Sequence, residues 1–120
     1  MTTAANLLIA LIALLHIWFL VLEMFLWTRP LGRRTFGTSA EFAAASRVLA
    51  ANQGLYNGFL AAGLAWGLWP GPGSGAVKLF FLGCVLVAGL YGGATVGRRI
   101  LLVQALPAAL ALLLLAWGRG

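Results

Sequence analysis

The hydrophobic residues of this chain are concentrated in long runs that short polar or glycine- and proline-containing connections separate. Four such runs cover approximately residues 4–27, 47–69, 76–96 and 100–117. Each is close to the roughly 20 apolar residues that a helix needs to cross a bilayer. Because backbone groups in lipid must be hydrogen-bonded within the protein, such runs predict helices. The pattern therefore predicts an all-α integral membrane protein with four spanning helices.

The connections between the runs carry residues typical of turns. Pro30 and Gly32 end the first run, and residues 70–75 form a proline- and glycine-rich turn after the second. Residues 97–99 leave so little chain that the third and fourth helices are predicted to form an antiparallel hairpin. We therefore expect a single domain over residues 1–120, folded as an antiparallel up-down four-helix bundle.

A helix-capping pattern precedes the second run. Thr38 is followed three residues later by Glu41, which is the spacing of a capping box. The second helix is therefore predicted to begin near Ser39, before it enters the membrane, and Glu41 is assigned no chemical role.

The composition agrees with a membrane location. Hydrophobic residues make up 62% of the chain and charged residues 8%, whereas soluble domains carry about 25% charged residues. The net charge of +6 does not indicate a nucleic-acid partner, because the cations lie between apolar runs, where they meet lipid headgroups.

The positions of the cations predict an orientation. Six lie beside the first and third connections and two lie beside the opposite ends of the runs: Arg29, Arg33, Arg34, Arg47, Arg98 and Arg99 in the first group, Lys78 and Arg119 in the second. By the positive-inside rule, the first and third connections are predicted to be cytoplasmic and both termini outside.

Glu23 is the residue around which we expect a site. It lies in the first apolar run, where an ionisable group costs roughly 2.5–3.5 kcal/mol on insertion scales. His16, the chain's single histidine, lies seven residues earlier on the same helical face, about 10 Å away along the axis. We expect Glu23 and His16 to be catalytic proton-transfer groups. The alternative interpretation is that each is a hydrogen-bonded packing residue.

Polar residues of the other runs are predicted to lie at the same depth as Glu23. Such residues in spanning helices face the bundle interior or a cavity. The predicted ligand-binding residues are Trp27, Asn52, Gln53, Tyr56, Asn57, Tyr91, Thr95 and Gln104. The sequence therefore predicts a polar pocket in the cytoplasmic half of the bundle.

Glycines at helical spacing form two ridges. One consists of Gly89, Gly93 and Gly97, and the other of Gly54 and Gly58. Small residues at this spacing let helices approach closely, either within one chain or between copies in a homo-oligomer. Both possibilities are open from the sequence.

No cofactor or metal site is expected. Cys84 is the only cysteine, so an internal disulfide is excluded, and no second ligand stands at zinc or haem spacing from His16.

Four segments together resemble a known family. They are H-x-x-x-x-x-x-E-x-F-L-W at residues 16–27, A-N-Q-G-L-Y-N-G-F-L-A-A-G-L at residues 51–64, V-A-G-L-Y-G-G-A-T at residues 87–95 and Q-A-L-P-A at residues 104–108. The chain resembles, over almost its whole length, small four-helix bacterial membrane proteins known as domain of unknown function 1304. The resemblance implies a four-helix membrane protein, which we expect in the inner membrane of a bacterium, and no particular reaction.

Three functions fit these residues. The first is binding of a lipophilic small molecule in the polar pocket, with isomerisation or hydration by Glu23 as acid or base, chemistry that needs no cofactor. The second is proton-coupled transport or export with Glu23 as the coupling carboxylate. The third is a non-catalytic membrane scaffold component. The sequence leaves open whether the protein is an enzyme. The expected partners are membrane lipid and a lipophilic molecule, without nucleic acid.

Overall fold

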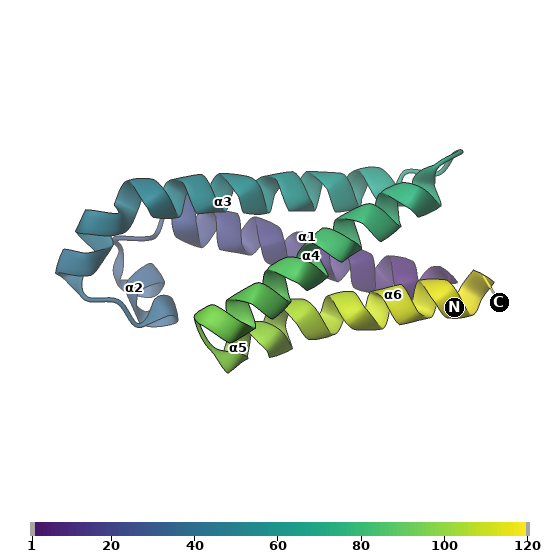
Figure 1. The fold of residues 1–120 in the computed structure, drawn as a ribbon. Coiled ribbons are helices and arrows are strands. Elements are labelled where there is room, and N and C mark those ends of the chain that lie inside the picture. The colour runs from purple at the N-terminus through teal and green to yellow at the C-terminus, as the bar shows by residue number, and fades with distance from the viewer. Residues whose placement is uncertain (1, 120) are drawn as a thin grey trace. The chain divides into compact units, whose positions relative to one another are not determined.

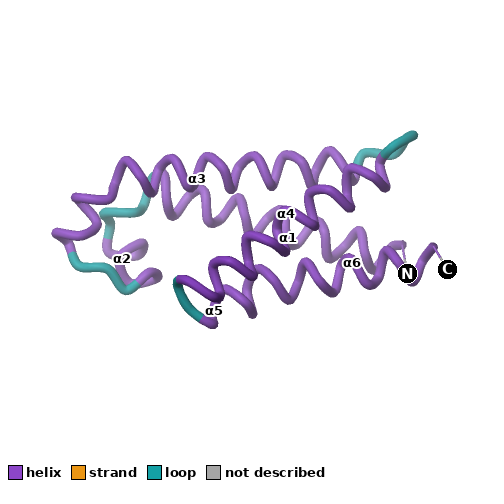
Figure 2. The backbone as a smooth tube through the Cα atoms, in the orientation of Figure 1, coloured by secondary structure: helices purple, strands orange, loops and turns teal. Residues whose placement is uncertain are grey.

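The computed structural model describes residues 2–119, which are almost entirely helical and contain no β-strand. The helices are α1 Thr2–Met24, α2 Pro30–Phe36, α3 Ala40–Leu68, α4 Ser74–Thr95, α5 Arg98–Ile100, the π-helical segment η1 Leu101–Ala105 and α6 Leu106–Arg119 (Figures 1 and 2). The predicted all-α class is confirmed.

Three helical stretches among the described residues, rather than four, are long and apolar enough to cross a membrane. They are α1, α4 and the continuous stretch Arg98–Gly118. The longest helix, α3 with 29 residues, is not among them, because Asn52, Gln53 and Asn57 interrupt its apolar sequence. These lengths are compatible with a membrane protein.

The first connection contains a short helix that the apolar pattern did not predict. Pro30 stands at the first position of α2, where its missing N–H and fixed φ are favourable. Gly37 ends α2 in the left-handed conformation, with φ of 67°, which glycine adopts without steric cost. A Cβ on Gly32 would lie 1.9 Å from the Leu26 carbonyl oxygen, so α2 is pressed directly onto the turn that follows α1.

The cap of α3 lies one residue later than the predicted capping box. The Ser39 hydroxyl accepts a hydrogen bond from the Phe42 N–H at 3.1 Å, and α3 begins at Ala40. Ser39 is therefore the N-cap, and the Thr38–Glu41 box is wrong. Glu41 lies in the first turn, where a carboxylate interacts favourably with the helix dipole.

The chain separates into two compact units, which are described one at a time. One contains residues 14–61, and the other contains residues 2–13 with 62–119. The prediction of a single domain stays a prediction.

In the unit of residues 14–61, the second half of α1 packs against α3 through glycines. A Cβ on Gly58 would lie 2.7 Å from Leu20 Cδ1, and one on Gly54 would lie 2.7 Å from Met24 Cγ. Residue numbers rise along α1 as they fall along α3, so the two helices are antiparallel. The Gly54–Gly58 ridge is thus occupied within the chain.

In the other unit, α4 packs against the returning stretch that contains α5, η1 and α6. A Cβ on Gly89 would lie 2.5 Å from the Ala105 nitrogen, and one on Gly93 would lie 2.3 Å from Leu101 Cδ2. This confirms close packing after the short third connection. Gly89 and Gly93 face the same chain, so a homo-oligomer contact would have to use another face.

The returning stretch is not a regular α-helix. The Leu106 N–H donates to the Leu101 carbonyl, a bond across five residues rather than four. Pro107 follows and has no N–H with which to continue the α-helical ladder. A π-bulge one turn before a proline is therefore the local response of the backbone to Pro107.

Lys78, counted above among the outer cations, is buried within the second unit. Its side chain is 8% exposed, and a Cβ on Gly67 would lie 2.9 Å from Lys78 Cγ. The aliphatic stem of Lys78 therefore lies along the surface of α3, as long cationic side chains do when they bury their methylene groups.

Candidate functional site

The centre of the candidate site is a hydrogen bond between α1 and α3. Asn57 Nδ2 donates to Glu23 Oε1 at 2.5 Å, and both side chains are half-buried. Asn57 presents its NH₂ group to the oxygen, which is the arrangement that suits an ionised carboxylate as acceptor. Of the three α3 amides predicted to surround Glu23, Asn57 is the one that the structure places in contact with it.

The glycines of α3 position this pair. A Cβ on Gly54 would lie 3.0 Å from Glu23 Cβ and 3.2 Å from the Leu20 carbonyl oxygen. Gly54 therefore lets the backbone of α1 approach α3 at the level of Glu23. Asn57 lies three residues after Gly54, almost one turn along α3, so its short side chain can reach the carboxylate.

The other polar residues of the same segment lie away from Glu23. Asn52, Gln53 and Tyr56 are exposed, Tyr56 by 54%, and the Tyr56 ring packs edge-on against Phe59 of its own helix. The reason is rotational: Gly54 and Gly58 turn their side of α3 toward α1, which leaves Asn52 and Tyr56 on the opposite side. Their predicted role in binding stays a prediction.

His16 is completely buried, with 0% of its surface exposed. Its ring packs edge-on against Phe19, with 5.4 Å between the ring centroids. His16 precedes Glu23 by seven residues in α1, and a ligand beside the half-buried Glu23 would meet His16 only if the buried surface around His16 opened. A catalytic role for His16 stays a prediction.

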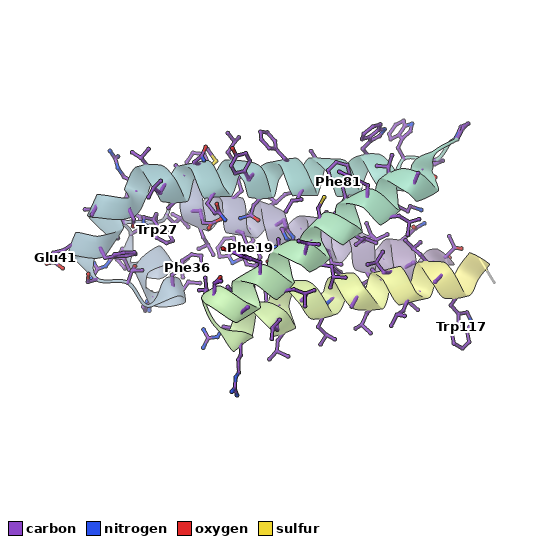
Figure 3. All side chains as sticks on the ribbon, viewed as in Figure 1. Phe19, Trp27, Phe36, Glu41, Phe81 and Trp117 are labelled. Carbon is purple, nitrogen blue, oxygen red and sulfur yellow. The ribbon has the colours of Figure 1, made fainter. Side chains whose placement is uncertain are left out.

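Trp27 belongs to a second set of contacts, just after α1 ends. Its Nε1–H donates to the Ser46 hydroxyl at 3.1 Å, and that hydroxyl donates to the Phe42 carbonyl at 2.6 Å. Its ring packs against Phe36 of α2, with 5.0 Å between the centroids (Figure 3). Trp27 thus connects α1, α2 and α3, an arrangement that suits a structural role better than the predicted rim of a pocket.

Sequence reasoning missed the partners of Trp27. Ser46 sits in an alanine-rich turn of α3 with nothing to distinguish it from other small residues, and Phe36 lies in the connection. The available signal was the composition of residues 30–37, in which a proline at the start and a glycine at the end bracket a short helix.

The remaining predicted binding residues belong to the other unit. Tyr91 is 72% exposed, and the Thr95 hydroxyl donates to the Tyr91 carbonyl at 2.8 Å, so Thr95 is satisfied within α4. Gln104 is half-buried within η1 and has a partner. The meeting of these residues with Glu23 stays a prediction.

The described residues offer no assembled metal site, since no three His, Cys, Asp or Glu side chains lie together among them. Cys84 is a half-buried free thiol. An apolar groove of about 380 Å³ lies among leucines and a tryptophan of the unit that contains α6: Leu8, Leu110, Leu113, Leu114 and Trp117. No ionisable group lines this groove, so it carries no chemistry of its own.

Comparison with known proteins identifies the family. The sequence profile described as "Protein of unknown function (DUF1304)" matches residues 10–116, a stretch that includes both Glu23 and Asn57. No curated protein and no solved structure matches the chain. Because the profile covers most of the chain, the protein belongs to the DUF1304 family.

Proposed function

We propose that this chain is an integral membrane protein in which α3 forms a fourth span, in addition to α1, α4 and the stretch from α5 to α6. With 29 residues, α3 is about 43 Å long, more than the roughly 30 Å hydrocarbon core of a bilayer. It is also packed antiparallel along an apolar span through Gly54 and Gly58, which supports a position inside the membrane. The result is a four-helix up-down arrangement.

The proposed orientation follows from the exposed cations. Arg29, Arg34 and Arg47 lie exposed around α2 and the start of α3, and Arg98 and Arg99 lie exposed at α5. These two connections are therefore proposed to face the cytoplasm of a bacterium, with both termini outside. Glu23, one residue before the end of α1, then lies near the cytoplasmic end of its span.

The function that this geometry supports best is binding of a lipophilic small molecule beside Glu23. The observation that carries the proposal is the half-buried Glu23–Asn57 hydrogen bond at the end of a predominantly apolar span. A carboxyl group at such a position is costly and is retained where it serves a ligand, an ion path or a proton relay. The adjoining apolar side chains of Leu20 and Met24 suit a molecule that arrives from the bilayer.

Glu23 is the carboxyl group of this site, and a carboxyl group can serve as a general acid or a general base. If the bound molecule is also transformed, the chemistry is a proton transfer such as isomerisation or hydration, with Glu23 as acid or base and Asn57 as the positioning residue. If the molecule is moved instead, Glu23 is the coupling carboxylate.

Replacement of Glu23 by glutamine tests the proposal. Glu23→Gln keeps an acceptor for Asn57 and removes the carboxyl proton, so the helix contact is retained while binding and proton transfer are lost. Glu41→Gln is the matched control, because Glu41 is the chain's other carboxylate and lies exposed in the first turn of α3.

The readouts are the lipid profile of cells that carry each variant and their resistance to lipophilic toxic compounds. We expect Glu23→Gln to match the deletion strain and Glu41→Gln to match the wild type. An accumulated lipid precursor indicates an enzyme, and lost resistance indicates export. If Glu23→Gln behaves as the wild type in both assays, the site has no such function and the scaffold interpretation holds.

A further inference from the structure

We propose that the molecule bound at Glu23 carries an ammonium group on a hydrocarbon tail. This inference rests on the lipophilic-ligand function proposed above and names the class of ligand. It depends on three features of the unit of residues 14–61: the charge around Glu23, the free capacity of the carboxylate, and the apolar surface beside it.

The charge of Glu23 is not compensated within the described part of the chain. Its hydrogen-bond partner, Asn57, is neutral, and no lysine or arginine of residues 2–118 pairs with it. The nearest cation in sequence is Arg29, which lies exposed beyond the end of α1. A half-buried anion with a neutral partner keeps most of its desolvation cost, and that cost falls when a cation binds.

The carboxylate also has room for a donor. Asn57 occupies Oε1, and an ionised carboxylate has about four acceptor positions on its two oxygens, so Oε2 can accept from a ligand. Glu23 is half-buried rather than enclosed, so a ligand can reach it. An ammonium N–H gives a charge-assisted hydrogen bond here, roughly twice as strong as the bond from a neutral hydroxyl.

The apolar side chains near the Glu23 carboxylate favour a ligand that has a hydrocarbon tail. Leu20 and Met24 flank Glu23 on α1 and pack over the glycines of α3. A small hydrophilic cation would gain little from these side chains, whereas an amphiphile keeps its tail in the bilayer and places its headgroup at the end of the span.

Two sources can supply this chemistry. One is a membrane-soluble amine, and the other is a lipid whose headgroup ends in a primary ammonium, such as phosphatidylethanolamine. Both present N–H donors and a positive charge beside a hydrocarbon tail, so the experiment below has one arm for each.

The full chain is placed in nanodiscs of phosphatidylcholine, whose headgroup has no N–H. Dodecylamine and dodecanol, which share a tail and differ in charge, are titrated into the wild type, Glu23→Gln and Glu41→Gln, and the thermal unfolding midpoint is followed by tryptophan fluorescence. We expect dodecylamine to stabilise the wild type and Glu41→Gln with about tenfold tighter apparent affinity than dodecanol, and Glu23→Gln to lose that preference.

Comparison of the two probes on the wild type needs no variant, so the proposal remains testable if Glu23→Gln does not fold. Glu23→Asp, which retains the charge, should retain a weaker preference for the amine. In nanodiscs with one fifth phosphatidylethanolamine, a reduced response to dodecylamine in the wild type identifies the lipid headgroup as the ligand, and an unchanged response identifies a separate amine.

Equal stabilisation by amine and alcohol, lost for both probes in Glu23→Gln, overturns the preference for an ammonium group and leaves a binding site for lipophilic molecules at Glu23. Responses to both probes that are the same in all three proteins overturn the binding site at Glu23 as well.

Discussion

Two pairs of glycines in this protein let helices pack closely, but the two contacts differ in the groups that they bring together. Gly54 and Gly58 bring α1 against α3, and Gly89 and Gly93 bring α4 against the stretch that contains η1. At the first contact, the partners include the β-carbon of a carboxylate residue and a hydrogen bond from Asn57. At the second, the partners are the backbone of Ala105 and the side chain of Leu101.

The two contacts differ in the atoms that occupy the space where a Cβ on the glycine would lie. At Gly89 the neighbour is backbone, which cannot rotate away, so the contact fixes the spacing of the two helices. At Gly54 the closest neighbour is Cγ of the Met24 side chain, which is flexible, and the close approach also sets the distance from Glu23 to Asn57. We infer that the first contact holds a functional pair and the second holds the hairpin together.

The largest expected effect is at the hairpin. Gly89→Ala places a methyl group 2.5 Å from the Ala105 nitrogen, and such overpacking typically costs about 1–3 kcal/mol of stability. The measurement is unfolding in mild detergent as sodium dodecyl sulfate is added. Gly83→Ala, on the same helix but with nothing within 4 Å of its Cβ, is the control and should be neutral. Equal losses from both variants would mean that Gly89 is not a packing position.

Asn57→Ala removes the side chain that donates a hydrogen bond to Glu23 where α3 packs against α1. Hydrogen bonds between membrane helices contribute about 0.6–1.7 kcal/mol, so we expect a stability loss in that range together with loss of the Glu23-dependent binding. Asn52→Ala is the matched control: it removes an exposed amide one and a half turns away and should change neither quantity. A larger effect from Asn52 would place the site on the outer face of α3.

Gly54→Ala tests whether Gly54 positions the Glu23 carboxylate in addition to stabilising the fold. Its methyl group would meet Met24 Cγ at 2.7 Å, which can move, and Glu23 Cβ at 3.0 Å, which can move less. We expect a stability loss of about 1 kcal/mol and a disproportionate loss of ligand affinity, because the carboxylate is displaced from Asn57. Binding that declines only in proportion to stability would contradict a positioning role for Gly54.

The smallest effect on ligand binding is expected at Trp27. Trp27→Phe keeps a ring for Phe36 but loses the donor to Ser46, which should cost about 0.5–1.5 kcal/mol and leave binding at Glu23 intact. Ser46→Ala removes the same bond from the other side, so the double variant should be little worse than either single one. Additive losses would show that Trp27 and Ser46 act independently.

Much of the fold was predictable because hydropathy and capping are local properties. The apolar runs located α1, α4 and the returning stretch, and the short third connection gave the hairpin. The exact cap of α3 was not predictable, since Thr38 and Ser39 are adjacent and both are good N-cap residues. The short helix α2 was missed because its seven residues carry no apolar run.

The sequence by itself determined that this chain is helical, that apolar stretches long enough to cross a bilayer dominate it, and that Glu23 is an exception within one of them. Only the tertiary structure decided which polar residue reaches Glu23. Asn52, Gln53 and Asn57 are chemically alike and lie within two turns of one helix, so their composition and spacing cannot rank them. The rotation of α3 about its axis, which Gly54 and Gly58 set by facing α1, selects Asn57.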